Sequence, residues 1–395
     1  MKLIYLESRK GILRCYVLIA LALFLFLSGF KIYTDYLAGE IRPVAANVGG
    51  MQSGYSQIYK RVCGPITEKT AGFVSSEYQR LTALTADGTY SRDRQKGTYS
   101  GYLFGDFYLF HKYFYPAMEY SVKYSTYTKQ ILKQAKENLK LYQEKGNKAE
   151  VAKNAYILQH YTGRNIEEFY SCDGWEALLA YNFSDLLILL LLILGIAPSF
   201  TRERENGMTL LLYSSKRSEW PLLLSKCGTA VIFASVLTIL FSLVNFLVFG
   251  ILCGFEGGTS PLYAIESYKN TPYAGTILSF YILCTVLKAM GFSITGLVLI
   301  LLSASFKKTL YPCLIGLGLG VLFCYASGWP VTTSWWHSLC YFLSPLTLTT
   351  GGELLISLRG ICFREAFLPQ LGILLVVQLI LAGGLIFVIR RKSCY

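Results

Sequence analysis

Charged residues and histidines are scarce in this sequence. Asp, Glu, Lys and Arg make up 15% of the 395 residues, and 53% are hydrophobic, whereas a soluble domain carries about 25% charged residues. The deficit indicates that much of the chain lies in lipid. With three histidines and no Cys-x-x-Cys pair or Cys/His cluster, the sequence gives no support for a zinc site.

Nucleotide-binding and catalytic motifs are missing as well. The sequence contains no GxxxxGK(S/T) phosphate loop, no HExxH, and no GxSxG in a strand-to-helix setting. Its apolar runs also lack the paired acids and histidines that are typical of proton pumps. We therefore expect a non-enzyme without catalytic residues, metal or cofactor of its own. The energy for any transport should come from a partner or from an ion gradient.

Long hydrophobic runs are present in number, and a helix needs roughly 20 apolar residues to cross the hydrocarbon core. Six runs are candidates, and the fifth is the shortest: 11–30, 178–197, 227–253, 274–303, 309–326 and 368–389. The first run has a basic start but no A-x-A-like cleavage site, which favours a retained span preceded by a short interfacial helix. The sequence thus predicts an all-α polytopic membrane protein with six transmembrane helices.

Positive charge identifies one face of this protein. With the N-terminus inside, the cytoplasmic pieces are 1–14, 198–226, 304–308 and 390–395. They hold 14 basic and 4 acidic residues, so they carry ten of the 13 net positive charges. The positive-inside rule then predicts both termini in the cytoplasm of a bacterial cell. Because the excess sits in short loops beside spans, the basic pI does not indicate a nucleic-acid partner.

The segment 34–176 is then an extracellular domain between the first two spans, which divides the chain into 1–33, 34–176 and 177–395. It holds 17 of the 30 tyrosines. Apolar and tyrosine residues recur every three or four positions from Tyr124 to Tyr142 and again from Val151 to Tyr161, which predicts a helical hairpin. Asn147, three residues before Glu150, fits the N-cap of its second helix.

Two questions about this domain stay open at the sequence level. The tyrosines of the hairpin form either a packed amphipathic face or a substrate-contacting surface. The turn-rich first half, Gly49–Tyr115, fits short strands as well as packed loops, so the domain is expected to be mainly helical with some irregular or β structure.

Four cysteines fall on the outer side in this topology. An oxidising compartment would allow the disulfides Cys63–Cys172 and Cys340–Cys362. Free thiols are the alternative.

The last outer loop, 327–367, is rich in interfacial aromatics such as Trp329, Trp335 and Trp336. The apolar stretch Leu346–Leu358 is too short to span. We predict two short helices in this loop that lie in the outer leaflet before the sixth span.

Polar groups within the apolar runs are few. Lys288 falls near the middle of the fourth run, Asp185 is in the second and Asn245 in the third. An unpaired charge there costs several kcal/mol. These residues line a transport path in one interpretation; in the other, Lys288 belongs to a structural pair or extends to the membrane surface.

The loop 198–226 has a distinctive sequence, PSFTRERENGMTLLLYSSKRSEWPLLLSK. Phe200 is followed by an Arg/Glu cluster at 202–205, then by Gly207-Met208-Thr209, an apolar stretch, the basic pair Lys216-Arg217, and Lys226. This order resembles the signature of ABC transporter permeases of the second exporter type. The six-span layout, the short basic N-terminal segment and the helices before the last span are similar to that family too.

The resemblance implies an ATP-driven exporter of the cell membrane. Thr201 to Leu212 would form a coupling helix in a cleft of a separate ATPase subunit, which binds ATP and Mg. Glu203, Arg204 and Glu205 would make charged contacts there, and Gly207 would allow the close turn. The expected coupling residues are Thr201, Arg202, Glu203, Arg204, Glu205, Asn206, Gly207 and Met208.

Two permease chains, identical or related, and two ATPase chains would form the working unit. The large outer domain departs from the simple members of that family, which leaves the substrate open; a peptide or antimicrobial is the expectation.

Two other functional classes remain open for this protein. A sensor or mechanotransmission protein would bind a ligand in the outer domain and relay the signal through the membrane. An ion-driven secondary transporter would show internal repeats and broken helices in matched halves, and the sequence shows no such symmetry.

Overall fold

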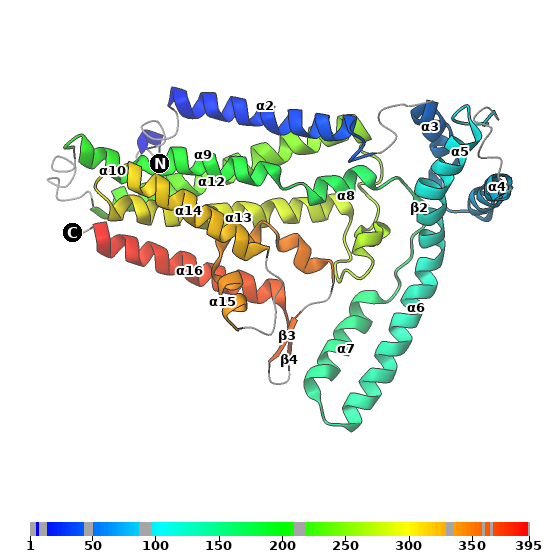
Figure 1. The fold of residues 1–395 in the computed structure, drawn as a ribbon. Helices are drawn as coiled ribbons and strands as arrows, with labels where there is room; N and C mark the ends of the chain where they lie inside the picture. The colour runs from blue at the N-terminus through cyan, green and yellow to red at the C-terminus, as the bar shows by residue number, and fades with distance from the viewer. Residues whose placement is uncertain are drawn as a thin grey trace.

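Helices dominate the computed structural model of this chain (Figure 1). The structure describes residues 5–7, 14–42, 50–86, 96–208, 219–328, 335–357, 360–363 and 366–393. Among them, six helices are long and apolar enough to cross a membrane: Cys15–Leu37, Asp173–Glu205, Pro221–Cys253, Ile277–Ser305, Leu310–Ser327 and Gln370–Arg391. The six predicted spans are confirmed by length and composition.

These spans are named by their helices as follows. The first is α2 (Cys15–Leu37), and the second consists of α8 (Asp173–Ala180), α9 (Phe183–Ile196) and α10 (Pro198–Glu205). The others are α12 (Glu219–Cys253), α13 (Ile277–Ser305), α14 (Leu310–Ser327) and α16 (Gln370–Ser393).

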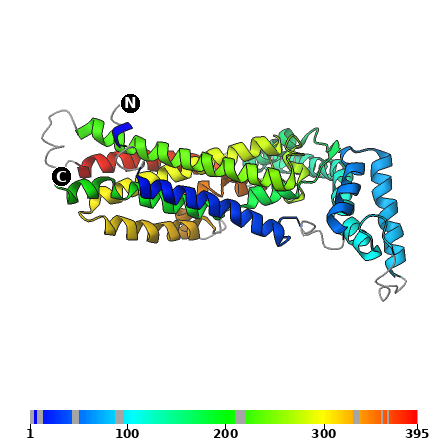
Figure 2. The same ribbon diagram turned by 90° about the horizontal axis from the view of Figure 1, so that it is seen from above.

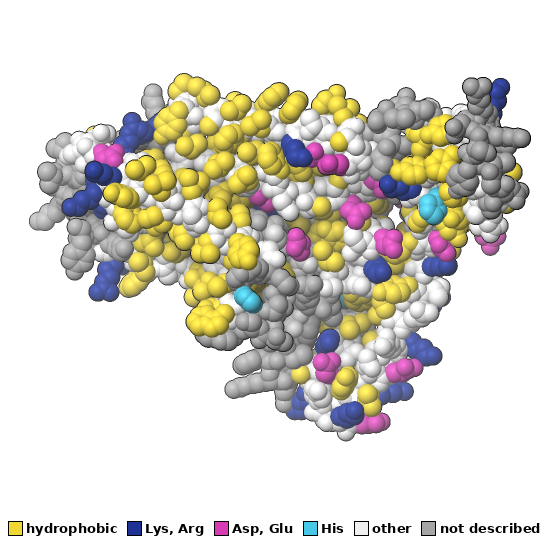
Figure 3. All heavy atoms as spheres, in the orientation of Figure 1, with side chains coloured by type: hydrophobic (Ala, Val, Ile, Leu, Met, Phe, Trp, Pro, Cys, Tyr) yellow, Lys and Arg dark blue, Asp and Glu magenta, His cyan; other side chains and the backbone are white. Residues whose placement is uncertain are grey.

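The bundle has a closely packed interior and an apolar exterior. Leu191, Leu192, Phe241 and Phe292, from α9, α12 and α13, are fully buried in one cluster. In lipid, helices associate through packing rather than through water exclusion, so close approach matters. A Cβ on Gly195 would lie 2.7 Å from a ring carbon of Phe233, so a side chain there would push α9 away from α12. Hydrophobic side chains cover the visible face of the bundle (Figure 3).

The bundle has two distinct ends. Residues 5–7, α10 and the last turn of α16 lie together at one end, which we call the α10 end (Figures 1 and 2). Residues 50–172, which we call the inserted domain, lie at the opposite end. The segments predicted to be cytoplasmic from their charge therefore meet at one end of the molecule, as far as they are described.

The inserted domain is helical. Its elements are α3 (Met51–Val62), α4 (Glu68–Ala86), α5 (Leu103–Leu109), a π-helical turn (Phe110–Phe114), α6 (Tyr115–Glu144) and α7 (Lys148–Tyr161). Its one described sheet is the two-residue pair β1 (Gly64–Pro65) and β2 (Glu168–Phe169). The open question about 49–115 is thus answered in favour of helices for the part that is described.

The helical hairpin predicted in this domain is confirmed. Helices α6 and α7 are antiparallel neighbours, and the side chain of Asn147 accepts a hydrogen bond from the backbone N–H of Glu150 at 3.3 Å. This bond satisfies one of the free amides at the start of α7.

Buried Asp106 anchors the segment before α5. Its carboxylate accepts hydrogen bonds from the backbone N–H groups of Thr98, Tyr99 and Ser100, at 2.5 to 3.2 Å, and from the Ser100 hydroxyl at 2.7 Å. A carboxylate with this many donors fixes a loop that has no regular structure of its own. The turn-rich composition gave no indication of this arrangement.

The tyrosines of the hairpin attach the inserted domain to the connection between α12 and α13. Tyr120 donates to the carbonyl of Tyr263 at 2.7 Å, and Tyr127 donates to the side chain of Asn270 at 2.5 Å. Buried Tyr124 stacks on Tyr263 with ring centroids 4.9 Å apart. These tyrosines therefore form a packed face, one of the two interpretations that the sequence allowed.

Arg164 makes further contacts between the inserted domain and the connection of α12 and α13. Its side chain is buried, it donates to the carbonyl of Thr271 at 2.6 Å, and its guanidinium lies 4.2 Å from the ring centre of Tyr161 and 5.0 Å from that of Tyr263. A guanidinium that is stacked and hydrogen-bonded in this way holds two segments rigidly. We call these contacts of Tyr120, Tyr124, Tyr127, Tyr161 and Arg164 the tyrosine joint.

The loop before the last span differs from the prediction. Its first helix is present as α15 (Trp335–Leu343), but the predicted second helix, Leu346–Leu358, is not an α-helix over its described residues 346–357. Two 3-10 turns, Pro345–Leu348 and Gly351–Leu355, occupy that stretch, followed by the hairpin β3 (Gly360–Phe363) and β4 (Ala366–Pro369). Pro345 and two consecutive glycines disfavour a continuous helix here. Trp329 lies outside the described residues.

The disulfide predicted between Cys63 and Cys172 is not formed, because both are free thiols. Each thiol instead donates to a nearby carbonyl, Cys63 to Lys60 at 3.9 Å and Cys172 to Tyr170 at 3.6 Å. Burial raises the pKa of the Cys172 thiol to about 12, which keeps it protonated and weakly nucleophilic. Cys340 is also a free thiol, and the side chain of its predicted partner Cys362 is not among those described.

Candidate functional site

Helix α10 continues the second span at the basic end of the bundle. It starts with Pro198, which suits the first turn of a helix, and ends at Glu205. Gly207 follows with φ of +67°, a left-handed conformation that costs other residues free energy. The predicted coupling helix, Thr201–Leu212, therefore starts earlier and ends earlier than expected, and its residues 209–212 lie outside the described part.

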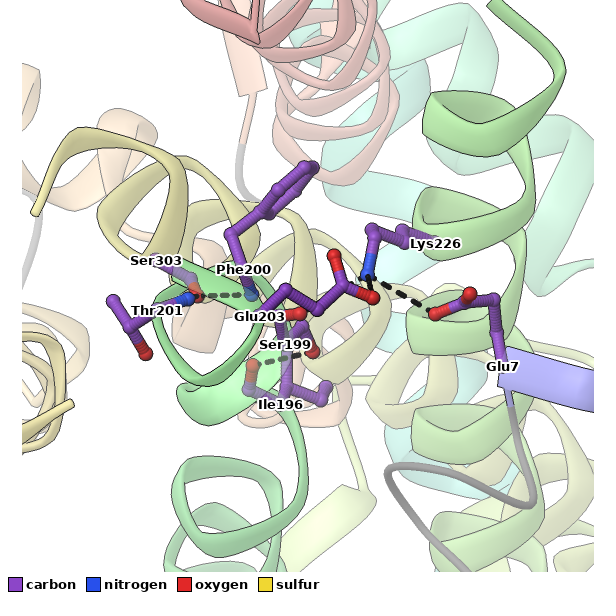
Figure 4. A network of polar contacts seen from close by, with 8 residues as sticks. All are labelled: Glu7, Ile196, Ser199, Phe200, Thr201, Glu203, Lys226 and Ser303. Atoms are coloured by element: carbon purple, nitrogen blue, oxygen red, sulfur yellow. Dashed lines mark hydrogen bonds and ion pairs between the residues drawn. The ribbon is translucent and has the colours of Figure 1, made fainter. Parts of the chain in front are cut away.

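Lys226 is the centre of a charge cluster beside α10 (Figure 4). Its ammonium lies 3.0 Å from a carboxylate oxygen of Glu7 and 2.9 Å from one of Glu203. It also donates to the carbonyl of Ser199 at 3.0 Å and lies 4.8 Å from the ring centre of Phe200. The Lys226 side chain is 2% exposed, so its charge is stable only because these partners compensate for lost hydration.

This cluster joins three segments that are distant in sequence. Glu7 comes from the N-terminal segment, Glu203 from α10 and Lys226 from α12 (Figure 4). We call it the Lys226 cluster.

The other side of α10 is bound to α13 and to the start of α14. The Ser303 hydroxyl accepts from the backbone N–H of Phe200 at 2.9 Å, and Arg204 donates to the carbonyl of Phe306 at 2.8 Å. Glu205 accepts from the backbone N–H of Thr309 at 2.7 Å and from its hydroxyl at 3.0 Å.

These contacts show where the structure places the predicted coupling residues. Thr201 is fully buried and shares a hydrogen bond with the Thr309 hydroxyl at 3.0 Å. Glu203, Arg204 and Glu205, predicted to contact an ATPase, also make contacts within the chain. Four exposed residues of this segment make no polar side-chain contact with the part of the chain that the structure describes: Arg202, Asn206, Gly207 and Met208.

Helices α12 and α13 connect this site to the other end of the molecule. Both run the length of the bundle from the α10 end to the inserted domain (Figure 1). At the α10 end, Lys226 of α12 and Ser303 of α13 contact α10. At the other end, the connection between these two helices carries the tyrosine joint. Two packed helices, α12 and α13, therefore link α10 to the inserted domain.

Asp185 and Lys288, predicted from their position in apolar runs, lie together. The Lys288 ammonium is 3.1 and 3.0 Å from the two carboxylate oxygens of Asp185, which joins α13 to α9. Asn245 binds elsewhere: it accepts from Ser28 at 2.9 Å and donates to Ser184 at 3.1 Å. All three residues border a cavity of about 20 Å³, which is the size of one water molecule. This geometry fits a structural ion pair.

A larger cavity, of about 210 Å³, lies at the α10 end. Its lining includes Arg14, Arg202 and the three members of the Lys226 cluster. Within the residues that the structure describes, no group of three or more His, Cys, Asp or Glu side chains could hold a metal ion. Charged side chains therefore make up part of the described lining of this cavity.

Comparisons of this chain with protein-family models, with curated proteins and with solved structures found no match.

Two parts of this site were missed in the sequence. Glu7 was counted only as an acid within a basic segment, yet it is one of the two carboxylates that compensate Lys226. Ser303 was counted as the end of an apolar run, yet its hydroxyl binds the backbone of α10. One signal was available for Lys226: a lysine at the start of an apolar run needs either solvent or a partner.

Proposed function

We propose that this chain is the membrane permease subunit of an exporter that is driven by ATP hydrolysis in a separate subunit. In this proposal the α10 end faces the cytoplasm and the inserted domain is extracellular. The observation that supports it best is the attachment of α10: one short helix at the basic end is bound to α12, α13 and the start of α14. A force on this helix would move three spans at once.

The exposed residues define where the partner would bind. Arg202, Asn206 and Met208 present the free surface of the α10 segment, whereas Glu203 and Glu205 hold the helix against the bundle. The ATPase would therefore contact Arg202 and the turn around Gly207. ATP-driven closure of two ATPase chains would push on α10 in each of two permease chains, and would thereby alter the path between them.

Site-specific crosslinking tests this proposal. A photoreactive residue at Asn206 or Met208, in the full chain in its native membrane, should capture a protein that contains a phosphate loop. The same residue at Lys307 serves as control, because Lys307 is exposed at the same end but lies outside the α10 segment. Absence of any such ATPase from the Asn206 and Met208 adducts would contradict the proposal.

A second experiment separates docking from folding. Arg202→Glu should uncouple ATP hydrolysis from transport by at least about tenfold and leave folding intact, since Arg202 is exposed. Glu203→Gln should instead lower stability, because it removes one of the charges that compensate buried Lys226. Normal coupling in Arg202→Glu would count against the docking role.

A transmitter of mechanical signals is the second candidate, and the tyrosine joint favours it. The inserted domain is fixed to the connection of α12 and α13, so a ligand bound outside could move α10 inside by the same route. The direction of transmission distinguishes the two functions: a transmitter would change α10 exposure when a ligand binds outside, without an ATPase.

A further inference from the structure

We propose that the 210 Å³ cavity at the α10 end binds the headgroup of an anionic phospholipid. The cavity lies between the start of α2, the junction of α9 and α10, and the first turns of α12. We call it the α10 cavity. This inference needs only a membrane-embedded bundle and does not depend on an ATPase partner.

The lining of the α10 cavity is apolar on the side toward the middle of the bundle and charged on the side toward its end. Its apolar wall comes from residues within the spans, such as Ile196 of α9, Ala230 of α12 and Ile300 of α13. Its charged wall comes from the end of the bundle, where Arg14 and Arg202 contribute guanidinium groups. A phospholipid has the same order along its length, with acyl chains toward the hydrocarbon core and phosphate at the boundary.

The charges of the described side chains that line the α10 cavity favour an anionic ligand. Three basic side chains, Arg14, Arg202 and Lys226, and two carboxylates, Glu7 and Glu203, line the cavity. Among these described side chains the positive charges outnumber the negative ones by one, and Lys226 contacts both carboxylates. A phosphodiester carries one negative charge, and a guanidinium can bind two of its oxygens at once.

The position of the α10 cavity matches headgroup depth. Helix α2 begins at Cys15, so Arg14 and the neighbouring Tyr16, which is 45% exposed, lie at the end of the first candidate span, where a span of this length would leave the hydrocarbon. Basic pockets between transmembrane helices at this level bind lipid headgroups in other membrane proteins. A lipid seated here would contact both the N-terminal segment and α10, and would thereby stabilise the Lys226 cluster.

Lipid titration of the full chain tests the proposal. The chain is reconstituted in phosphatidylcholine nanodiscs, and labelled phosphatidylglycerol is added at increasing mole fraction while bound lipid is measured. Arg14→Gln combined with Arg202→Gln should weaken binding about thirtyfold, and exposed Arg202→Gln alone about fivefold. Arg202→Lys should restore part of the loss.

The matched control is Lys307→Gln combined with Lys308→Gln. It removes two exposed cations from the same end of the bundle but outside the cavity, and it should change binding by less than about twofold. An equal loss in both double variants would show general attraction to the basic surface and would overturn the proposal. No loss in Arg202→Gln would overturn it too.

Soluble anions distinguish the source of the phosphate. Glycerol phosphate and inorganic phosphate, at concentrations far above that of the lipid, should not displace the labelled phosphatidylglycerol, because they lack the acyl chains that the apolar wall contacts. Displacement by either would identify a site for a soluble anion instead of a lipid. Thermal unfolding of each variant checks that the fold is retained.

Discussion

At the scale of single residues, buried charges in this protein are compensated by partners that are distant in the sequence. Lys288 is held by Asp185 between two spans, and Lys226 by Glu7 and Glu203 at the α10 end. Removing one member of such a pair leaves an uncompensated charge, which is far more costly than replacing both members. Replacing both members of an ion pair with apolar residues therefore distinguishes a pair that serves stability alone from a pair that is needed for function.

Lys288→Met should destabilise the bundle by about 3–5 kcal/mol, since it leaves Asp185 charged in an apolar environment. The double variant Lys288→Met with Asp185→Leu should recover most of that loss. Thermal unfolding in a fixed detergent measures both. If the double variant is stable but transport or signal transmission is abolished, then the pair lines a functional path and the structural interpretation is wrong.

At the scale of elements, α10 is held by contacts from outside its own short helix. It follows α9 after a single helical residue, Ala197, and the backbone contact from Ser303 and the Glu205 contact with Thr309 fix it against α13 and α14. The same contacts would give the proposed partner a firmly held helix to bind.

Ser303→Ala should loosen α10 without disturbing the rest of α13. The variant leaves the backbone N–H of Phe200 without its acceptor, at a cost of about 1–3 kcal/mol, and hydrogen exchange of residues 198–205 should become faster. Ser305→Ala is the matched control, because its hydroxyl bonds the Leu301 carbonyl within α13. Equal exchange rates in the two variants would contradict the role given to Ser303.

At the scale of the whole molecule, the bundle connects two unlike ends. The described parts of the basic segments lie at the α10 end, and the other end carries the inserted domain, which is attached by the tyrosine joint (Figure 1). The positive-inside rule assigns the α10 end to the cytoplasm. The positions of the inserted domain and of the basic segments at opposite ends of the bundle agree with the topology that the positive-inside rule predicts.

Cysteine labelling checks this topology. A membrane-impermeant maleimide should label Lys145→Cys, at the exposed tip of the α6–α7 hairpin, in intact cells. It should label Lys307→Cys, also exposed, only after the membrane is permeabilised. Each substitution is made in a background without the native cysteines. The reverse pattern would invert the topology and would place α10 out of reach of a cytoplasmic ATPase.

Composition and periodicity alone were sufficient for the six spans, the α6–α7 hairpin and its Asn147 cap. Each of these depends on neighbours within one segment: a helix in lipid must close its own backbone hydrogen bonds, and a cap acts three residues along the chain. Positive charge beside the spans also indicated which segments meet at one end.

Only the tertiary structure decided what the polar residues do. Lys226 and Glu7 are separated by 219 positions and Lys288 and Asp185 by 103, so no local pattern relates them. The same holds for the contacts that Glu203, Arg204 and Glu205 make with Lys226, Phe306 and Thr309. A charge close to the apolar interior is stable only beside its counter-charge, and the packing of the helices determines which residue provides it.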